Sequence, residues 1–91
     1  MIQVINNVIK RDGIKIGTVI GDHIVDFHDN KIAYFTDKEA YGADGKKIAY
    51  LDGEFIIFPV NNTKVRIEDN NKLVSGLVSD ICRAAIRLTL G

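Results

Sequence analysis

The sequence predicts a mainly β protein with four β-hairpin units of 16-residue period, which form a closed or flower-like antiparallel sheet, and one C-terminal α-helix. Three observations predict this fold: an internal repeat, turn-forming dipeptides at regular spacing, and a change of hydrophobic period near residue 72. The chain of 91 residues has the size of one domain. We place the hairpin repeats in residues 1–68 and an amphipathic helix in residues 72–90.

The internal repeat aligns segments of the chain at a step of 16 residues. Segment 12–19 lines up with 28–35 and with 44–51, and no gap is needed. A fourth turn is expected around residue 60. The strand after it, 64–67, matches only after a slip of one residue, which we interpret as a bulge or a longer loop.

The turns of the repeat are rich in aspartate, asparagine and glycine. Asp12-Gly13 and Asp44-Gly45 suit type I′ hairpin turns, in which both central residues have positive φ. Between the turns lie runs of five to seven residues rich in Ile, Val, Tyr and Phe, which is strand composition. We therefore expect no helix between residues 14 and 58.

The outgoing strand of each unit carries different residue types on its two faces. One face has an isoleucine followed by Thr or Tyr, and the other has a small residue followed by a larger apolar one. A small residue once per unit predicts crowding where the strands converge on a common axis. Because both faces are partly apolar, we expect a second layer to cover part of the outer face. The two sets are Ile16, Ile32, Ile48 with Thr18, Tyr34, Tyr50, and Gly17, Ala33, Ala49 with Val19, Phe35, Leu51.

Residues 72–90 show helical spacing of apolar residues over about half of the helix circumference. Asn70 or Asn71 is a suitable N-cap, and Gly91 a suitable end. A sheet face can cover only part of this apolar arc, so we expect the rest to contact a second copy in a homo-oligomer, most simply a dimer. The interface candidates are Leu77, Ile81 and Leu88. The alternative is that the hairpins wrap around the helix and bury it within one chain.

The pattern Asp-Gly-x-Lys-Ile-Gly/Ala-x-apolar, repeated over residues 7–68, resembles the small bacterial domains called four-fold β-flower proteins. Two departures from this pattern are the replacement of Asp-Gly by His28-Asp29-Asn30 in the second unit and the slip in the fourth. The resemblance implies a fold of four related hairpins. It implies no activity and no functional residue, because the family has no assigned activity.

The amino-acid composition limits the kinds of partner and the compartment that we expect for this protein. Lys plus Arg and Asp plus Glu number 12 each, so the net charge gives no reason to expect a nucleic-acid or membrane partner. The start of the chain lacks the features of a signal peptide, and no apolar run is long enough to span a bilayer, so we expect a cytoplasmic protein. The single cysteine, Cys82, excludes an intrachain disulfide and is expected to be a buried, unreactive thiol.

The densest polar stretch is Asp22–Asp29, which includes the His23–Asp29 hairpin and both histidines. Asp26 and His28 are two residues apart, so they share a strand face and are the candidates for a metal site, but two ligands are too few. No metal, cofactor or catalytic constellation is indicated, so we expect a protein that is not an enzyme. Tyr34, Tyr41 and Tyr50 are interpreted first as strand packing and second as a stacking platform, which would need neighbouring Lys and Arg.

Two functions remain. The first is a non-catalytic interaction or assembly module that oligomerises and binds a protein partner. The second is a small-ligand or metal-binding protein that uses the His23–Asp29 hairpin.

Overall fold

A computed structural model describes residues 1–91 as one ten-stranded sheet with two helices. No helix lies between residues 14 and 58, as predicted. The elements are β1 (Ile2–Ile5), β2 (Val8–Arg11), β3 (Ile14–Ile20), β4 (His23–Asp26), β5 (Lys31–Phe35), β6 (Glu39–Gly42), β7 (Lys47–Asp52), β8 (Phe55–Phe58), β9 (Thr63–Arg66), α1 (Ile67–Leu73), β10 (Val74–Gly76) and α2 (Asp80–Leu90).

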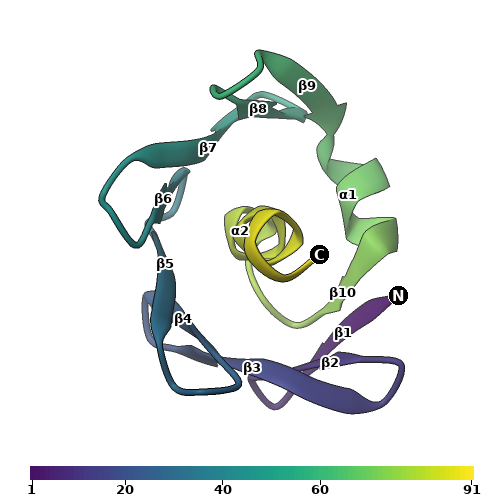
Figure 1. The fold of residues 1–91 in the computed structure, drawn as a ribbon. Coiled ribbons are helices and arrows are strands. Elements are labelled where there is room, and N and C mark those ends of the chain that lie inside the picture. Colours follow the sequence, from purple (N-terminus) through teal and green to yellow (C-terminus); the bar gives the residue numbers. More distant parts are fainter.

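The sheet curls around α2. Strands β1 to β9 follow one another as antiparallel neighbours, and β10 adds to the β1 edge in parallel. Figure 1 shows this wall of strands around α2, with α1 in the opening between β9 and β10. The sheet is therefore open, and the prediction of a closed sheet is wrong: β9 and β10 do not pair, and a helix stands where a strand would be needed.

Three hairpins carry a β-bulge at the same place in the repeat. Ile9 pairs with Gly17 and Lys10 with Lys15, which leaves Ile16 as the extra residue. Ile32 and Ile48 are the extra residues of β5 and β7. A bulge bends its strand and resets the alternation of side chains.

This reset corrects the prediction about the two faces. Ile16, Ile32 and Ile48 pack against the core, next to the small residues that follow them, although simple alternation places them on the outer face. The outer face is thus less apolar than the sequence indicates. No second layer lies against it (Figure 1).

The fourth hairpin lacks the bulge. In β8 and β9, Ile56 pairs with Val65 and Ile57 with Lys64 without a register shift. Of the two interpretations of the slip, the longer loop is confirmed, because six residues separate Ile57 from Lys64 and five separate Tyr41 from Lys47. The other, a bulge in the fourth unit, is wrong. Lys64 takes the place of Lys47 because the extra residue of the first three units is absent from β9.

The small residues of the repeat lie at a crowded place, as predicted, and the element that crowds them is α2 together with the neighbouring strands. Ala33 and Ala49 are fully buried in the core. A Cβ atom on Gly17 would lie 2.6 Å from the carbonyl oxygen of Val25 and 3.1 Å from Leu90 of α2. Small side chains here let the curved sheet approach the helix.

One of the two predicted type I′ turns is confirmed. Asp12 and Gly13 both have positive φ, at 51° and 84°. At the other turn only Gly45 does, so the type I′ assignment of Asp44-Gly45 is wrong. A five-residue connection between Tyr41 and Lys47 replaces the two-residue turn.

The prediction of one helix over residues 72–90 is also wrong. The chain is helical in α1, extended in β10, and helical again from Asp80. Gly76 has a φ of 132°, which no helix contains, and Ser79 rather than Asn70 or Asn71 accepts a hydrogen bond from the N–H of Cys82 as the N-cap. Gly91 ends the helix as predicted.

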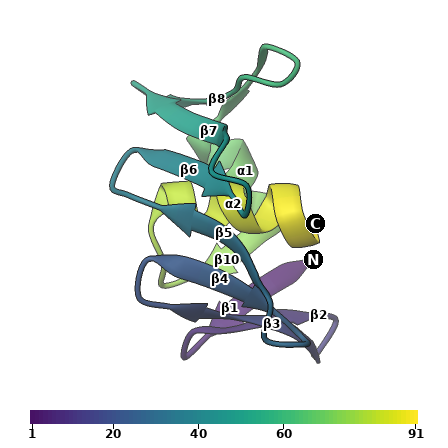
Figure 2. The same cartoon turned by 60° about the vertical axis from the view of Figure 1, so that its left-hand side comes forward.

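The helix α2 is wrapped by its own chain, which is the alternative that the sequence left open. It contacts β5, β6, β7, β10 and α1 (Figure 2). Its fully buried residues are Ile81, Cys82, Ala84, Ala85 and Ile86. Neither helix has the length and apolar character required to cross a membrane.

Candidate functional site

Aromatic side chains lie on the outer face of the sheet between β4 and β9, in rows of paired residues that each end in a lysine or an arginine. Antiparallel pairing places directly paired residues side by side on one face of the sheet. Two such rows run across the outer face: His23, Tyr34, Tyr41, Lys47, and Glu39, Tyr50, Ile57, Lys64. A third row, Asp52, Phe55 and Arg66, lies beside the second row.

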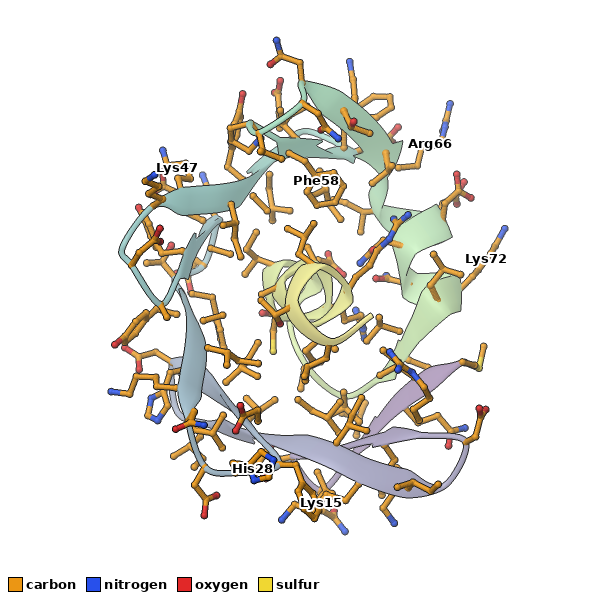
Figure 3. The ribbon with its side chains drawn as sticks, viewed as in Figure 1. Lys15, His28, Lys47, Phe58, Arg66 and Lys72 are labelled. Carbon is orange, nitrogen blue, oxygen red and sulfur yellow. The ribbon has the colours of Figure 1, made fainter.

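Cations lie over the aromatic rings of this face. Lys31 Nζ is 5.1 Å from the centroid of the Tyr34 ring, and Lys64 Nζ is 4.1 Å from that of Phe55. Lys47 lies over Tyr50 at 5.7 Å. These distances are within the range of cation–π attraction. Figure 3 shows Lys15, Lys47 and Arg66 pointing away from the helix, whereas Phe58 points toward it.

Two acidic residues lie on this face: Asp52 is paired with Phe55, and Glu39 is held by two hydrogen bonds. Lys47 Nζ lies 2.5 Å from Glu39 Oε2, and the Tyr41 hydroxyl donates a hydrogen bond of 3.1 Å to Glu39 Oε1. The hydrogen bond from Lys47, followed by that from Tyr41, holds the pKa of Glu39 below its ordinary value. The same bonds raise the pKa of Lys47 and of Tyr41, because each favours the protonated partner.

Charge is segregated between the strands and the rest of the chain. The ten strands contain seven Lys and Arg and three Asp and Glu, a net charge of +4. The turns and helices hold the other five Lys and Arg and nine Asp and Glu, a net charge of −4. The net charge of zero is therefore the sum of a basic set of strands and an acidic set of turns and helices. The strand residues are Lys10, Arg11, Lys15, Lys31, Lys47, Lys64 and Arg66 against Asp26, Glu39 and Asp52.

The His23–Asp29 hairpin is held by its own loop. Asp26 Oδ1 accepts hydrogen bonds from the N–H groups of His28 and Asn30, at 2.8 and 2.9 Å. The bond from Asn30 is the largest cause of the lowered pKa of Asp26, beside the smaller one from His28. The imidazole of His28 is exposed and packs edge-on against Phe27, and His23 lies beside Tyr34 instead. No group of three or more His, Cys, Asp or Glu side chains has an arrangement that could hold a metal ion.

The contact between the two helices is polar. Arg87 donates a hydrogen bond of 3.3 Å to Oδ1 of the fully buried Asn70, and Asn71 donates one of 3.3 Å to Asp80. Arg83 donates to Asp80 at 2.9 Å and to the carbonyl of Gly76. These bonds tie α1 and β10 to α2, so we assign them to the fold.

Cys82 is buried in α2, as predicted. Burial raises the pKa of its thiol to about 12, against the smaller opposing effect of Arg83. The thiol is therefore uncharged at neutral pH, and a protonated thiol is a poor nucleophile.

The three interface candidates have different surroundings. Ile81 is 0% exposed within the chain, so its assignment to an interface is corrected: the curved sheet already covers it. Leu88 is 41% exposed and lies in an open groove of about 470 Å³ between two hairpin tips. Leu77 lies in the loop before α2 and is 100% exposed.

The sequence analysis gave Tyr34, Tyr41 and Tyr50 a stacking platform only as a second interpretation, and it did not predict the lysines that lie beside them on the outer face of β5–β9. The signal was present, because Lys15, Lys31 and Lys47 recur at the period of 16. The β-bulge explains why simple alternation of side chains does not predict this surface. It brings Lys31 and Tyr34 onto the same face although they are three residues apart in the strand.

Comparisons with family models, with curated proteins and with solved structures gave no match for this chain.

Proposed function

We propose that this protein is a non-catalytic interaction module, and that the outer face of β5–β9 is its binding surface. The observation that carries the proposal is the repeated pairing of a cation with an aromatic ring on an uncovered sheet face. Aromatic and arginine side chains are enriched where proteins bind partners. The alternative, metal or small-ligand binding at His23–Asp29, has less support because Asp26 is engaged by its own loop.

We further propose how the four hairpins are related to one another. The hairpins β2–β3, β4–β5, β6–β7 and β8–β9 follow the 16-residue period, and three share a bulge. We propose that these hairpins are four petals of a flower-like arrangement, as in the four-fold β-flower proteins. The missing fourth bulge and the helix in the opening then mark where the symmetry is broken.

Photo-crosslinking tests the binding surface. A benzophenone amino acid in place of Tyr50 is expected to form adducts in the producing cell, whereas the same group in place of the exposed Lys72 on α1 is not. Unmodified protein should compete the adducts away, and the double variant Lys31→Glu, Lys64→Glu should not, because it reverses the charge of the face. Equal adducts from positions 50 and 72 would contradict the proposed surface.

We also propose that the module associates with itself through the rim at Leu77. The fully exposed Leu77 and the 51% exposed Ile5 line one surface hollow, and exposed apolar patches favour contacts. The patch is small, so we expect a dimer of modest affinity.

Sedimentation at micromolar concentrations is expected to show a mass that rises from 10.1 kDa toward twice that value. Leu77→Ser should abolish the rise. Val60→Ser should not, although Val60 is 87% exposed at a hairpin tip. A mass of 10.1 kDa at every concentration would refute self-association, and it would not affect the proposal that the outer face of β5–β9 is a binding surface.

A further inference from the structure

We propose that the partner of the outer face of β5–β9 is a single-stranded nucleic acid, with bases stacked on Tyr34, Tyr50 and Phe55 and phosphates bound by Lys31, Lys64 and Arg66. This inference rests on the proposed function, since it names the partner class of the same surface. It departs from the expectation, drawn from the neutral total charge, that no nucleic acid binds.

The aromatic rings supply the stacking surfaces. Tyr34, Tyr50 and Phe55 are half-buried, so the sheet holds each ring in place. A base that stacks on the outer side of a ring would displace the cation that lies over it, which then becomes available to a phosphate. Stacking on aromatic rings is how proteins bind unpaired bases with little sequence preference. Bases inside a duplex are stacked on one another and cannot use these rings, so the rings favour a single strand.

The lysines supply a path for the backbone. Lys15, Lys31, Lys47 and Lys64 lie on alternate strands, β3, β5, β7 and β9. Alternate strands are about 10 Å apart, so these lysines form a row across the sheet. Of the cations over the rings, Lys31, Lys64 and Arg66 have no acidic partner, which leaves their charges free for phosphate.

Glu39 opposes this binding and thereby provides a sharp test. Its carboxylate pairs with Lys47 and lies beside Tyr50 in the sheet, where it would repel a phosphate. Removal of this charge should therefore improve binding, an outcome that a loss of folding cannot mimic.

The experiment measures fluorescence anisotropy of labelled oligonucleotides at 50 mM salt. The probes are a single-stranded oligothymidine, a single-stranded oligouridine and a DNA duplex of the same length. Both single strands are expected to bind more tightly than the duplex. If the surface contacts about four phosphates, the slope of log K against log salt should be about −3.

Variants that remove a single charge test the proposed phosphate contacts. Lys31→Gln and Lys64→Gln should each weaken binding about 5- to 10-fold at 50 mM salt and reduce the slope by about 0.7. Glu39→Gln should strengthen binding by several-fold. Lys72→Gln removes the same charge from α1, where the lysine points away from the sheet (Figure 3), and should leave the affinity unchanged.

Aromatic variants test the stacking. Tyr50→Ala should weaken binding about 5- to 100-fold, whereas Tyr50→Phe should retain it, because the ring and not the hydroxyl supports the base. Thermal unfolding of both variants shows whether they are folded at the temperature of measurement.

Several results would overturn the inference. These are the absence of single-strand binding at 50 mM salt, an equal affinity for the duplex, or affinities that ignore the Tyr50 ring and follow charge alone. If crosslinking at position 50 yields specific protein adducts while the oligonucleotides do not bind, the proposed binding surface stands and the nucleic-acid partner is refuted.

Discussion

Replacing Ile86 by alanine is expected to lower the free energy of unfolding by about 2–5 kcal/mol. Ile86 lies in α2 and is 0% exposed, because the sheet surrounds the helix. The loss combines the transfer free energy of the deleted carbons with the cavity that a curved sheet cannot close. The total stability of a chain this long is on the order of 5–14 kcal/mol, so this is a large fraction. Urea denaturation measures the change.

The matched control is Leu88→Ala on the same helix. Leu88 is 41% exposed, so its truncation removes fewer buried contacts and should cost less than about 1.5 kcal/mol. Similar losses for the two variants would mean that α2 does not occupy the centre of the sheet.

Gly76→Ala is expected to destabilise the protein by about 3 kcal/mol or more, since backbone strain and steric overlap add. Gly76 has a φ of 132°, which an alanine rarely adopts. An added Cβ would lie 2.3 Å from the carbonyl oxygen of Val4, inside the parallel pairing of β1 with β10. Amide hydrogen exchange should therefore accelerate at β1.

Gly53→Ala separates these two causes. Gly53 also has a positive φ, of 61°, but an added Cβ would meet no atom within 4 Å. Only backbone strain remains there, so the expected loss is about 1 kcal/mol. If Gly76→Ala costs no more than this control, β10 is not held against β1 as described.

The repeat was predictable because its cause is local. Asp-Gly dipeptides favour turns, although only Asp12-Gly13 forms the type I′ turn, and the small residue at Ala33 and Ala49 indicates crowding at one place in each unit. The mainly β class, the hairpins and the C-terminal helix therefore follow from the sequence alone. The lysines of the outer face recur in the same repeat, but simple alternation places Lys31 and Tyr34 on opposite faces, and only the bulge brings them together.

The break in the predicted helix required the tertiary structure. Residues 73, 74, 77 and 78 match a helical period, and the local signs of a break are confined to Gly76, which weakens a helix, and Ser79, which can cap one. Val74 and Gly76 are extended because β1 offers them backbone partners at Ile2 and Val4, from the other end of the chain. A pairing between segments so far apart leaves no trace in local periodicity.

The period of 16, the strand composition and the apolar arc of the last helix can all be derived from local patterns in the chain. Which surfaces those features occupy depends on the folded arrangement of the strands. Three bulges turn Ile16, Ile32 and Ile48 toward the core and leave tyrosines and lysines on the outer face, and the curved sheet covers Ile81. Alternation and composition are properties of a single strand. Bulges, curvature and the burial of a central helix depend on how all the strands pair.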